Sequence, residues 1–170
     1  MLRKLRKQSG FTLVELLIVV IILAILAAIV VPQFGSTTAD ANNAAYESNL
    51  AALQSVVELY RQQHNGVYPG AVQSGGGSCS TGSAVSGNVN TQEAFIAQLS
   101  NFTNVQGQAC TGFSANNHRF GPYLKEGVPN NPLGNSNQVV VVNTGILGLS
   151  SGGTGGWRYD VITGELIGDQ

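Results

Sequence analysis

The chain has 170 residues, enough for one domain with a modest core, and only 10% of them are charged, against ~25% in a typical soluble domain. Four of the eight basic residues precede Gly10, whereas the chain from Phe11 onward holds four basic and nine acidic side chains, a net charge of −5. A nucleic-acid-binding surface needs the opposite sign to neutralise phosphates, so no nucleic-acid partner is predicted.

Residues 11–31 form an apolar run of 21 residues in which Glu15 is the only charged side chain. At 1.5 Å per residue a helix of this length spans about 30 Å, the thickness of the hydrocarbon core of a bilayer. Leucine, isoleucine, valine and alanine occupy every face, so the run is not amphipathic. The basic residues on its N-terminal side predict a single-pass span with a cytoplasmic N-terminus and an exported remainder.

A cleavable secretory signal is the alternative interpretation of this segment. The apolar core of such a signal usually has about 7 to 15 residues and ends at an A-x-A-like site. Here residues 16–31 are 16 uninterrupted apolar residues, and the nearest tripeptide of that kind, Ala39-Asp40-Ala41, lies beyond Pro32. We therefore favour an apolar segment that is retained in the mature protein.

Glu15 lies inside the apolar run without a basic side chain near it in sequence. An ionisable group in a membrane segment costs up to about a few kcal/mol, less near an end, and usually has a partner. No Lys or Arg occurs between Lys7 and Arg61. A new α-amino group, created by cutting the chain before the apolar run and presented by a second copy, would supply that partner.

The stretch KQSGFTLVELLIVVIILAILAAIVVPQF, residues 7–34, resembles the N-terminus of type IV prepilins and of type II secretion pseudopilins. This resemblance implies that a dedicated membrane peptidase removes a basic leader, residues 1–10, by cutting between Gly10 and Phe11. It also implies that the same enzyme methylates the new N-terminal residue, Phe11. Because glycine has no Cβ, Gly10 lets the backbone enter the peptidase site closely.

The same resemblance assigns roles to two further residues. Glu15 is expected to be the carboxylate that supports assembly, and Pro32 is expected to bend the helix. Proline cannot donate a backbone hydrogen bond, so Pro32 should kink or interrupt the helix where the apolar segment, residues 11–32, ends. Ala24 departs from the family pattern, since many type IV pilins have a helix-loosening glycine at that position.

After Pro32, one apolar stripe predicts an amphipathic helix of the head over residues 33–65. The stripe has spacings of 4, 3, 4 and 3 and consists of Tyr46, Leu50, Leu53, Val57 and Tyr60. We expect it to pack on a sheet formed by the rest of the chain. Asn65-Gly66 suits a left-handed C-terminal cap, and Pro69 blocks continuation of the helix.

Residues 66–170 are predicted to form a loop-rich head, because 21 of the 22 glycines lie beyond residue 34. SGGGS at 74–78 and SGGTGG at 151–156 are typical of flexible or turn-rich loops. A short helix should begin after Thr91, with Phe95, Ile96 and Leu99 inward. Strands are predicted from Val139 and from Trp157, the second leading into a hairpin around Thr163-Gly164.

Three stretches of the head, LYRQQHNGVYP, GPYLKEGVPNNPLG and GWRYDVITGEL, resemble the major pseudopilin of type II secretion. The resemblance implies a helix followed by a small antiparallel sheet of three or four strands. Some of these pseudopilins bind calcium in the loop before the last strands. Here Asn130, Asn131, Asn135 and Asp160 offer oxygen atoms without clustered carboxylates, so calcium stays an open alternative with no ligands assigned.

The only two cysteines, Cys79 and Cys110, both lie in the exported part of the chain. An even count in an oxidising compartment predicts one disulfide. Two unpaired or metal-bound thiols are the alternative, although His64 and His118 are isolated and far apart in sequence. No nucleophile-and-base motif is found, so no enzymatic activity and no catalytic residue are predicted.

Together these features predict an α+β, pilin-like fold in which a long N-terminal helix packs on a small antiparallel sheet with Gly/Ser-rich loops. The predicted function is that of a structural subunit of a type IV pilus-like filament, anchored in the bacterial inner membrane. Expected partners are copies of itself, the prepilin peptidase and methyltransferase, an inner-membrane assembly platform, and minor pilins or pseudopilins. The filament could serve type II secretion, a type IV pilus or DNA uptake. The rival interpretation is an uncleaved, membrane-anchored exported enzyme or binding protein.

Overall fold

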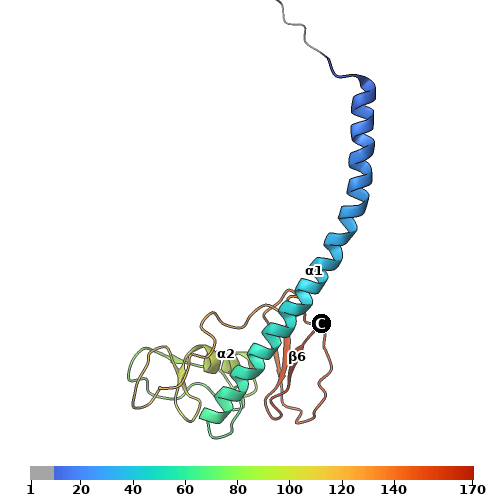
Figure 1. Cartoon of the computed structure of the whole chain (residues 1–170). Coiled ribbons are helices and arrows are strands. Elements are labelled where there is room, and N and C mark those ends of the chain that lie inside the picture. The colour runs from blue at the N-terminus through green and yellow to red at the C-terminus, as the bar shows by residue number, and fades with distance from the viewer. Residues whose placement is uncertain (1–9) are drawn as a thin grey trace, which may run out of the picture. The chain divides into compact units, whose positions relative to one another are not determined.

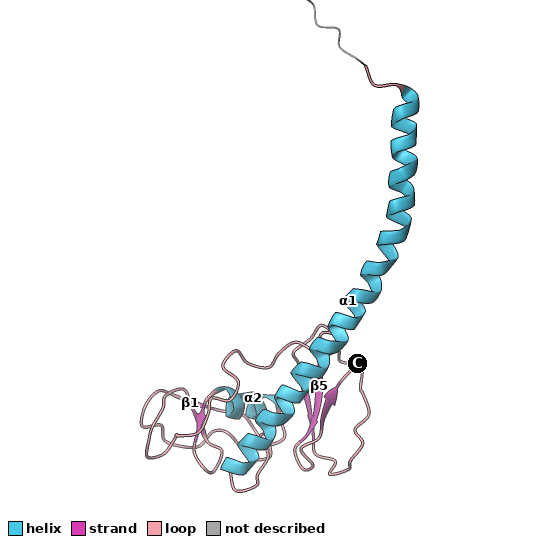
Figure 2. Ribbon diagram, in the orientation of Figure 1, coloured by secondary structure: helices cyan, strands magenta, loops and turns pink. Residues whose placement is uncertain are grey.

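The structure is a computed structural model that describes residues 10–170, apart from the side chains of residues 29–36. The basic leader predicted over residues 1–10 lies outside these residues, except for Gly10. The chain forms two compact units, residues 1–41 and residues 42–170, and each is described by itself. Figure 1 shows the elements coloured in chain order, and Figure 2 distinguishes helices, strands and loops.

The first element, α1, runs from Leu13 to Gln63. Its backbone is helical through Pro32, so the predicted interruption at this proline does not occur. A proline removes one backbone hydrogen bond and crowds the carbonyl four residues before it, which can bend a helix without ending it. The bend expected at Pro32 is not tested and stays a prediction. Within the described residues, no helix is long and apolar enough to cross a membrane, and the apolar segment expected over residues 11–32 stays a prediction.

In the second unit, the C-terminal part of α1 carries the predicted apolar stripe. Leu53, Val57 and Tyr60 are fully buried, while Tyr46 and Leu50 are partly buried against the core. The stripe therefore packs inward, as its spacing predicts.

The C-terminal cap of α1 is also as predicted. Asn65 and Gly66 adopt φ values of 56° and 83°. The N–H of Gly66 donates to the carbonyl of Arg61 at 2.9 Å, which satisfies a carbonyl of the last turn.

The second helix, α2, runs from Gln92 to Ser100 and is capped by Thr91, whose hydroxyl accepts from the Ala94 N–H at 3.3 Å. Phe95 and Leu99 are fully buried, and Ile96 is half-buried against the core. Figure 2 shows α2 and the strands gathered along the C-terminal part of α1. The core joins these elements, and its remaining members are Val128, Val139, Trp157, Tyr159, Val161 and Leu166.

Three strands close to the C-terminus form one sheet in the order β4 (Val139–Val142), β5 (Trp157–Asp160) and β6 (Leu166–Gly168). β5 and β6 form the predicted antiparallel hairpin. β4 pairs with β5 in parallel, which corrects the expectation of an all-antiparallel sheet. A parallel pair requires a long connection, and residues 143–156 provide it without a helix.

A second sheet was not predicted. It has the order β1 (Ala84–Val85), β3 (Ala109–Cys110) and β2 (Phe102–Thr103), all antiparallel. Each strand has two residues, too few to give an alternating pattern in the sequence. The head is therefore α+β, with two small sheets in place of one.

Candidate functional site

Gly10 and Phe11, the residues of the predicted cleavage site, are exposed at the start of the described chain. A Cβ added at Gly10 would meet no atom within 4 Å. Packing within the described chain therefore does not require a glycine at this position. A requirement for glycine here would come from another molecule.

Glu15 lies three residues after Thr12, the residue that precedes the first turn of α1. The Thr12 hydroxyl and the Thr12 backbone N–H both donate to Oε2 of Glu15, at 2.8 and 2.9 Å. In return, the Glu15 N–H donates to Oγ1 of Thr12 at 3.2 Å. This reciprocal arrangement is a capping box, which satisfies backbone donors that the first turn of a helix leaves free. The T-x-x-E pattern before an apolar run could have revealed it.

The capping box changes the expectation that Glu15 has no partner within its own chain. All described hydrogen bonds of its carboxylate end on Oε2. Oε1 thus faces no donor among the described residues, and the side chain is exposed. One oxygen of Glu15 is held locally, and the other accepts no hydrogen bond from the described residues.

The first turns of α1 expose an unusually large apolar surface. Phe11 is 76% exposed and Leu13 is 80% exposed. The other exposed large apolar side chains in this stretch are Val14, Leu16, Leu17, Ile18, Val19, Val20, Ile21, Ile22, Leu23, Ile25 and Leu26. An apolar surface of this extent marks a site of contact with other apolar groups.

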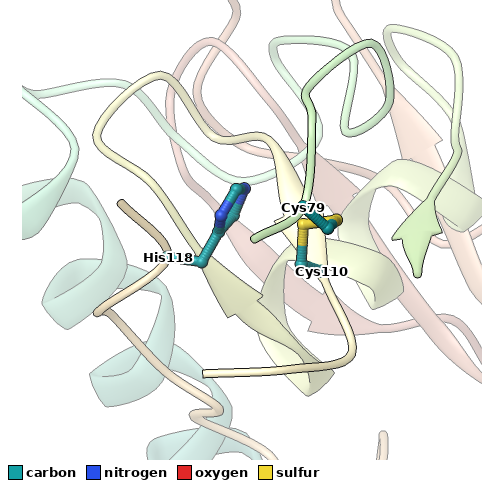
Figure 3. A group of neighbouring side chains, drawn as sticks. All are labelled: Cys79, Cys110 and His118. Carbon is teal, nitrogen blue, oxygen red and sulfur yellow. A yellow bond between two sulfur atoms is a disulfide. The ribbon is translucent and has the colours of Figure 1, made fainter. Parts of the chain in front are cut away.

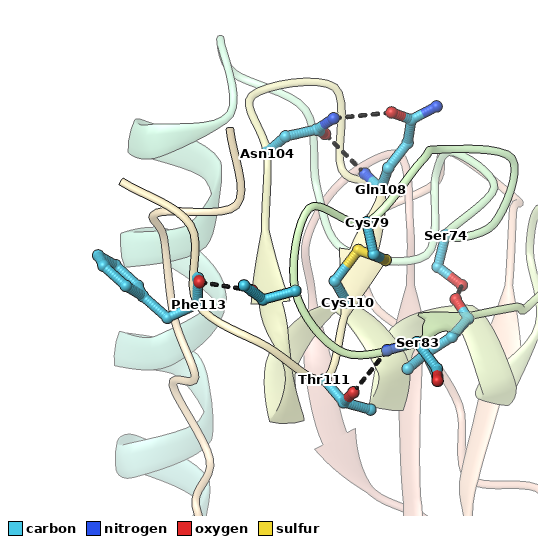
Figure 4. The surroundings of a disulfide bond; sticks show 10 residues. Ser74, Cys79, Ser83, Asn104, Gln108, Cys110, Thr111 and Phe113 are labelled. Carbon is cyan, nitrogen blue, oxygen red and sulfur yellow. Dashed lines mark hydrogen bonds between the residues drawn. A yellow bond between two sulfur atoms is a disulfide. The ribbon is translucent and has the colours of Figure 1, made fainter. Parts of the chain in front are cut away.

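In the head, Cys79 and Cys110 form the expected disulfide, with their Cα atoms 5.9 Å apart. Figure 4 shows its surroundings, in which hydrogen bonds hold the flanking loops. The Ser83 N–H donates to Oγ1 of Thr111 at 2.9 Å. The bond closes a loop that contains α2.

The two histidines differ sharply in their surroundings. The ring nitrogens of His64 lie 2.8 Å from the Tyr60 carbonyl and 2.9 Å from the Thr103 hydroxyl. His118 is fully buried, and neither of its ring nitrogens has a hydrogen-bond partner. Although it is isolated in sequence, His118 lies beside the disulfide, with a ring nitrogen and both sulfur atoms within 4.8 Å of one another (Figure 3).

Two of the four residues considered for calcium, Asp160 and Asn131, use their side chains to hold loops. Oδ2 of Asp160 accepts from the N–H groups of Thr144 and Gly145 at 2.9 and 3.0 Å, and Oδ1 accepts from Ile162 at 2.7 Å. Burial raises the pKa of Asp160, but hydrogen bonds, first among them the one from the Thr144 hydroxyl, outweigh it and hold the pKa below its ordinary value. The Asn131 side chain accepts from the Leu133 N–H at 3.0 Å.

Sequence reasoning missed Asp169, which holds the glycine-rich loop at 151–156. Its buried carboxylate accepts from the N–H groups of Gly152 and Gly153 and lies 4.0 Å from the Arg158 guanidinium. Burial raises the pKa of Asp169, but hydrogen bonds, first among them the one from Thr154, bring it below its ordinary value. The composition left open a flexible or a turn-rich loop here, and the hydrogen bonds to Asp169 anchor this loop.

Comparisons with known proteins agree with these features. A family model described as a prokaryotic N-terminal methylation motif matches residues 5–31. The type II secretion system core protein G of Vibrio cholerae is 30% identical over 137 residues, which are 81% of this chain and 73% of that protein. The protein of the same name from Pseudomonas aeruginosa is 41% identical over 68 residues, 40% of this chain and 47% of that protein.

A type IV pilus protein is also similar. The type IV narrow pilus major component of Thermus thermophilus is 41% identical over 61 residues, 36% of this chain and 53% of that protein. No solved structure gives a significant match to the chain.

Proposed function

Since the chain belongs to the family of the type II secretion system core protein G, whose members are pilus-like structural subunits, we propose that it is processed and polymerised as a filament subunit. Processing would consist of cleavage between Gly10 and Phe11 and methylation of Phe11. The methylation motif, which matches residues 5–31 and so includes both residues, is the observation that carries this proposal.

The exposed apolar part of α1 supports polymerisation through this helix. Its side chains are exposed in the single chain, and packing them against the same helix of other copies would remove them from water or lipid. A contact between two different surfaces of the subunit does not close on itself, so its repetition produces a fibre. The helices would form the filament core and the heads its surface.

Glu15 would guide this assembly. After cleavage, the α-amino group of Phe11 in one subunit carries a positive charge. The exposed Oε1 of Glu15 in a neighbouring subunit would accept a hydrogen bond from this group and pair with its charge. The Thr12 hydrogen bonds on Oε2 would hold the carboxylate in place without using Oε1. Attraction between the two charges is strong in an apolar surrounding, and a carboxylate left there without a partner is costly.

The proposed location is the bacterial inner membrane, with the head exported. The proposed partners are the prepilin peptidase and methyltransferase, an inner-membrane assembly platform, and minor pilins or pseudopilins. Relatives from type II secretion and from a type IV pilus both match the chain, and core protein G of type II secretion provides the longer match. We therefore favour a secretion pseudopilus over a type IV pilus.

Replacing Glu15 in a strain without the natural copy tests the proposed assembly role. Glu15→Ala and Glu15→Gln should be cut, methylated and anchored normally but should form few filaments, counted by electron microscopy. Glu47→Gln, an exposed glutamate further along α1, is the matched control and should assemble normally. Abundant filaments from Glu15→Ala at normal expression would contradict the assembly role.

A further inference from the structure

The buried imidazole of His118 lies beside the sulfur atoms of Cys79 and Cys110, the two cysteines of the chain. The side chain is fully buried, yet both ring nitrogens lack a hydrogen-bond partner. Buried polar atoms are nearly always paired, so an unpaired pair of ring nitrogens calls for an explanation. Figure 3 shows the ring beside the Cys79–Cys110 bond.

The backbone around His118 fixes this position. The His118 carbonyl accepts from the Ser114 N–H at 3.0 Å, which closes a tight loop. Two residues later, Phe120 exchanges two backbone hydrogen bonds with Thr103, at 2.9 and 3.1 Å, and so joins the loop to β2. Since β2 pairs with β3, which contains Cys110, one small sheet positions the imidazole and a sulfur atom.

We propose that reduction of the disulfide converts Cys79, Cys110 and His118 into a binding site for a thiophilic divalent cation such as Zn²⁺. Two thiolates and one imidazole are soft and borderline donors, the set that favours zinc over calcium or magnesium. Three protein ligands would leave a fourth position for water. This site is independent of the proposed filament function.

The distances are compatible with such a site. With Zn–S of about 2.3 Å and Zn–N of about 2.0–2.1 Å, tetrahedral geometry places ligand atoms about 3.5–3.8 Å apart. The nitrogen and the two sulfur atoms already lie within 4.8 Å of one another. Small side-chain rotations would therefore suffice once the S–S bond is broken. Cys79 is only half-buried, which provides an entry path for the ion.

The chemistry balances with a phosphine as the reductant. The phosphine gives two electrons to the S–S bond and becomes a phosphine oxide with the oxygen of one water molecule, whose two protons go to the sulfur atoms. Binding of the ion then displaces both thiol protons. Oxidised and metal-bound forms exclude each other, because both use the same two sulfur atoms.

Titration with Co²⁺, a spectroscopic substitute for Zn²⁺, tests the site in the full chain held in detergent micelles. The phosphine-reduced chain should bind one ion with a thiolate-to-cobalt charge-transfer band, and the oxidised chain should show no such band. His118→Ala should weaken binding at least about tenfold, since loss of even an outer-shell partner costs that much. His64→Gln, which changes the histidine that already has partners, should bind like the natural chain.

The unfolding temperature of the reduced chain gives a second measurement. An ion that binds only the folded state stabilises it, so Zn²⁺ should raise this temperature for the natural chain but not for a Cys79→Ser, Cys110→Ser double variant. Three results would overturn the proposal. They are no uptake by the reduced chain, equal affinity without His118, and a reduced head that unfolds and is not restored by Zn²⁺.

Discussion

Thr12 holds Glu15 through two hydrogen bonds to a single carboxylate oxygen, Oε2, at 2.8 and 2.9 Å. We propose two tasks for this carboxylate. One oxygen caps the helix within its own subunit, and the other is left for the amine of a neighbour. Thr12 would thus act as a positioning residue for Glu15.

Replacing Thr12 with valine should loosen the start of α1. Valine keeps the shape of threonine but has no hydroxyl to accept from the Glu15 N–H, so the first turn should lose about 1 kcal/mol. Hydrogen exchange of the Glu15 amide, measured by NMR on the full chain in micelles, should become faster. Thr12→Ser keeps the hydroxyl and should exchange at the natural rate. Equal rates in all three chains would show that the capping box does not form.

Replacing Gly10 with valine should block removal of the leader. The branched side chain would crowd the approach of the peptidase, whereas the described chain itself has no atom within 4 Å of an added Cβ. The head of Gly10→Val should therefore unfold at the same temperature as the wild-type head. On a denaturing gel, the variant should keep the size of the uncut chain. Normal amounts of the cut form would show that the cleavage site lies elsewhere.

Removing the Gln98 side chain should strongly destabilise the head. Its carboxamide accepts from the Gly70 N–H at 2.6 Å and donates to the carbonyls of Val72 and Gly107 at 3.0 and 2.9 Å. Gln98→Ala leaves these three backbone groups without that partner, and each such group costs about 1–3 kcal/mol when it stays buried.

The fluorescence of Trp157, the one tryptophan in the sequence and fully buried, reports unfolding of the head. Gln98→Ala should lower the free energy of unfolding by at least about 2 kcal/mol. The exposed Gln106 offers a control, and Gln106→Ala should change stability by less than about 0.5 kcal/mol. Similar effects of the two substitutions would contradict the role given to Gln98.

Acid should destabilise the head through Asp160 and Asp169. Their pKa values in the folded chain lie below the ordinary value of 3.8, so the unfolded chain takes up protons first as the pH falls. Their contribution is thus complete above the ordinary value and is lost as the pH falls through the folded values. Asp160→Asn should be less stable at pH 7 and should lose less stability on acidification. If the free energy of unfolding of Asp160→Asn depended on pH as strongly as that of the wild-type chain, Asp160 would not be a cause of the acid sensitivity.

Much of the head could be predicted because its signals are local. The spacing from Tyr46 to Tyr60, the Asn65-Gly66 cap and the Thr91 cap each occupy a few neighbouring residues, and each is found as predicted. The hairpin around Gly164 was likewise predicted from neighbouring residues and is found.

The errors concern contacts between distant residues. The parallel pairing of β4 with β5 depends on how the loop at 143–156 returns, and its anchors, Asp160 and Asp169, follow that loop in sequence. The approach of His118 to the disulfide likewise depends on the second sheet, whose strands are too short to leave a pattern. The Thr12–Glu15 capping box is different, since its signal is local and could have been read.

Mass spectrometry of the N-terminal peptide of the mature protein tests the central claim most directly. The protein would be purified from membranes and from sheared filaments of cells that contain the peptidase. We expect a first residue of Phe11 carrying one added methyl group, with residues 1–10 absent. An N-terminal peptide that begins at Met1, or at any residue other than Phe11, would contradict the proposal that the chain is a processed filament subunit.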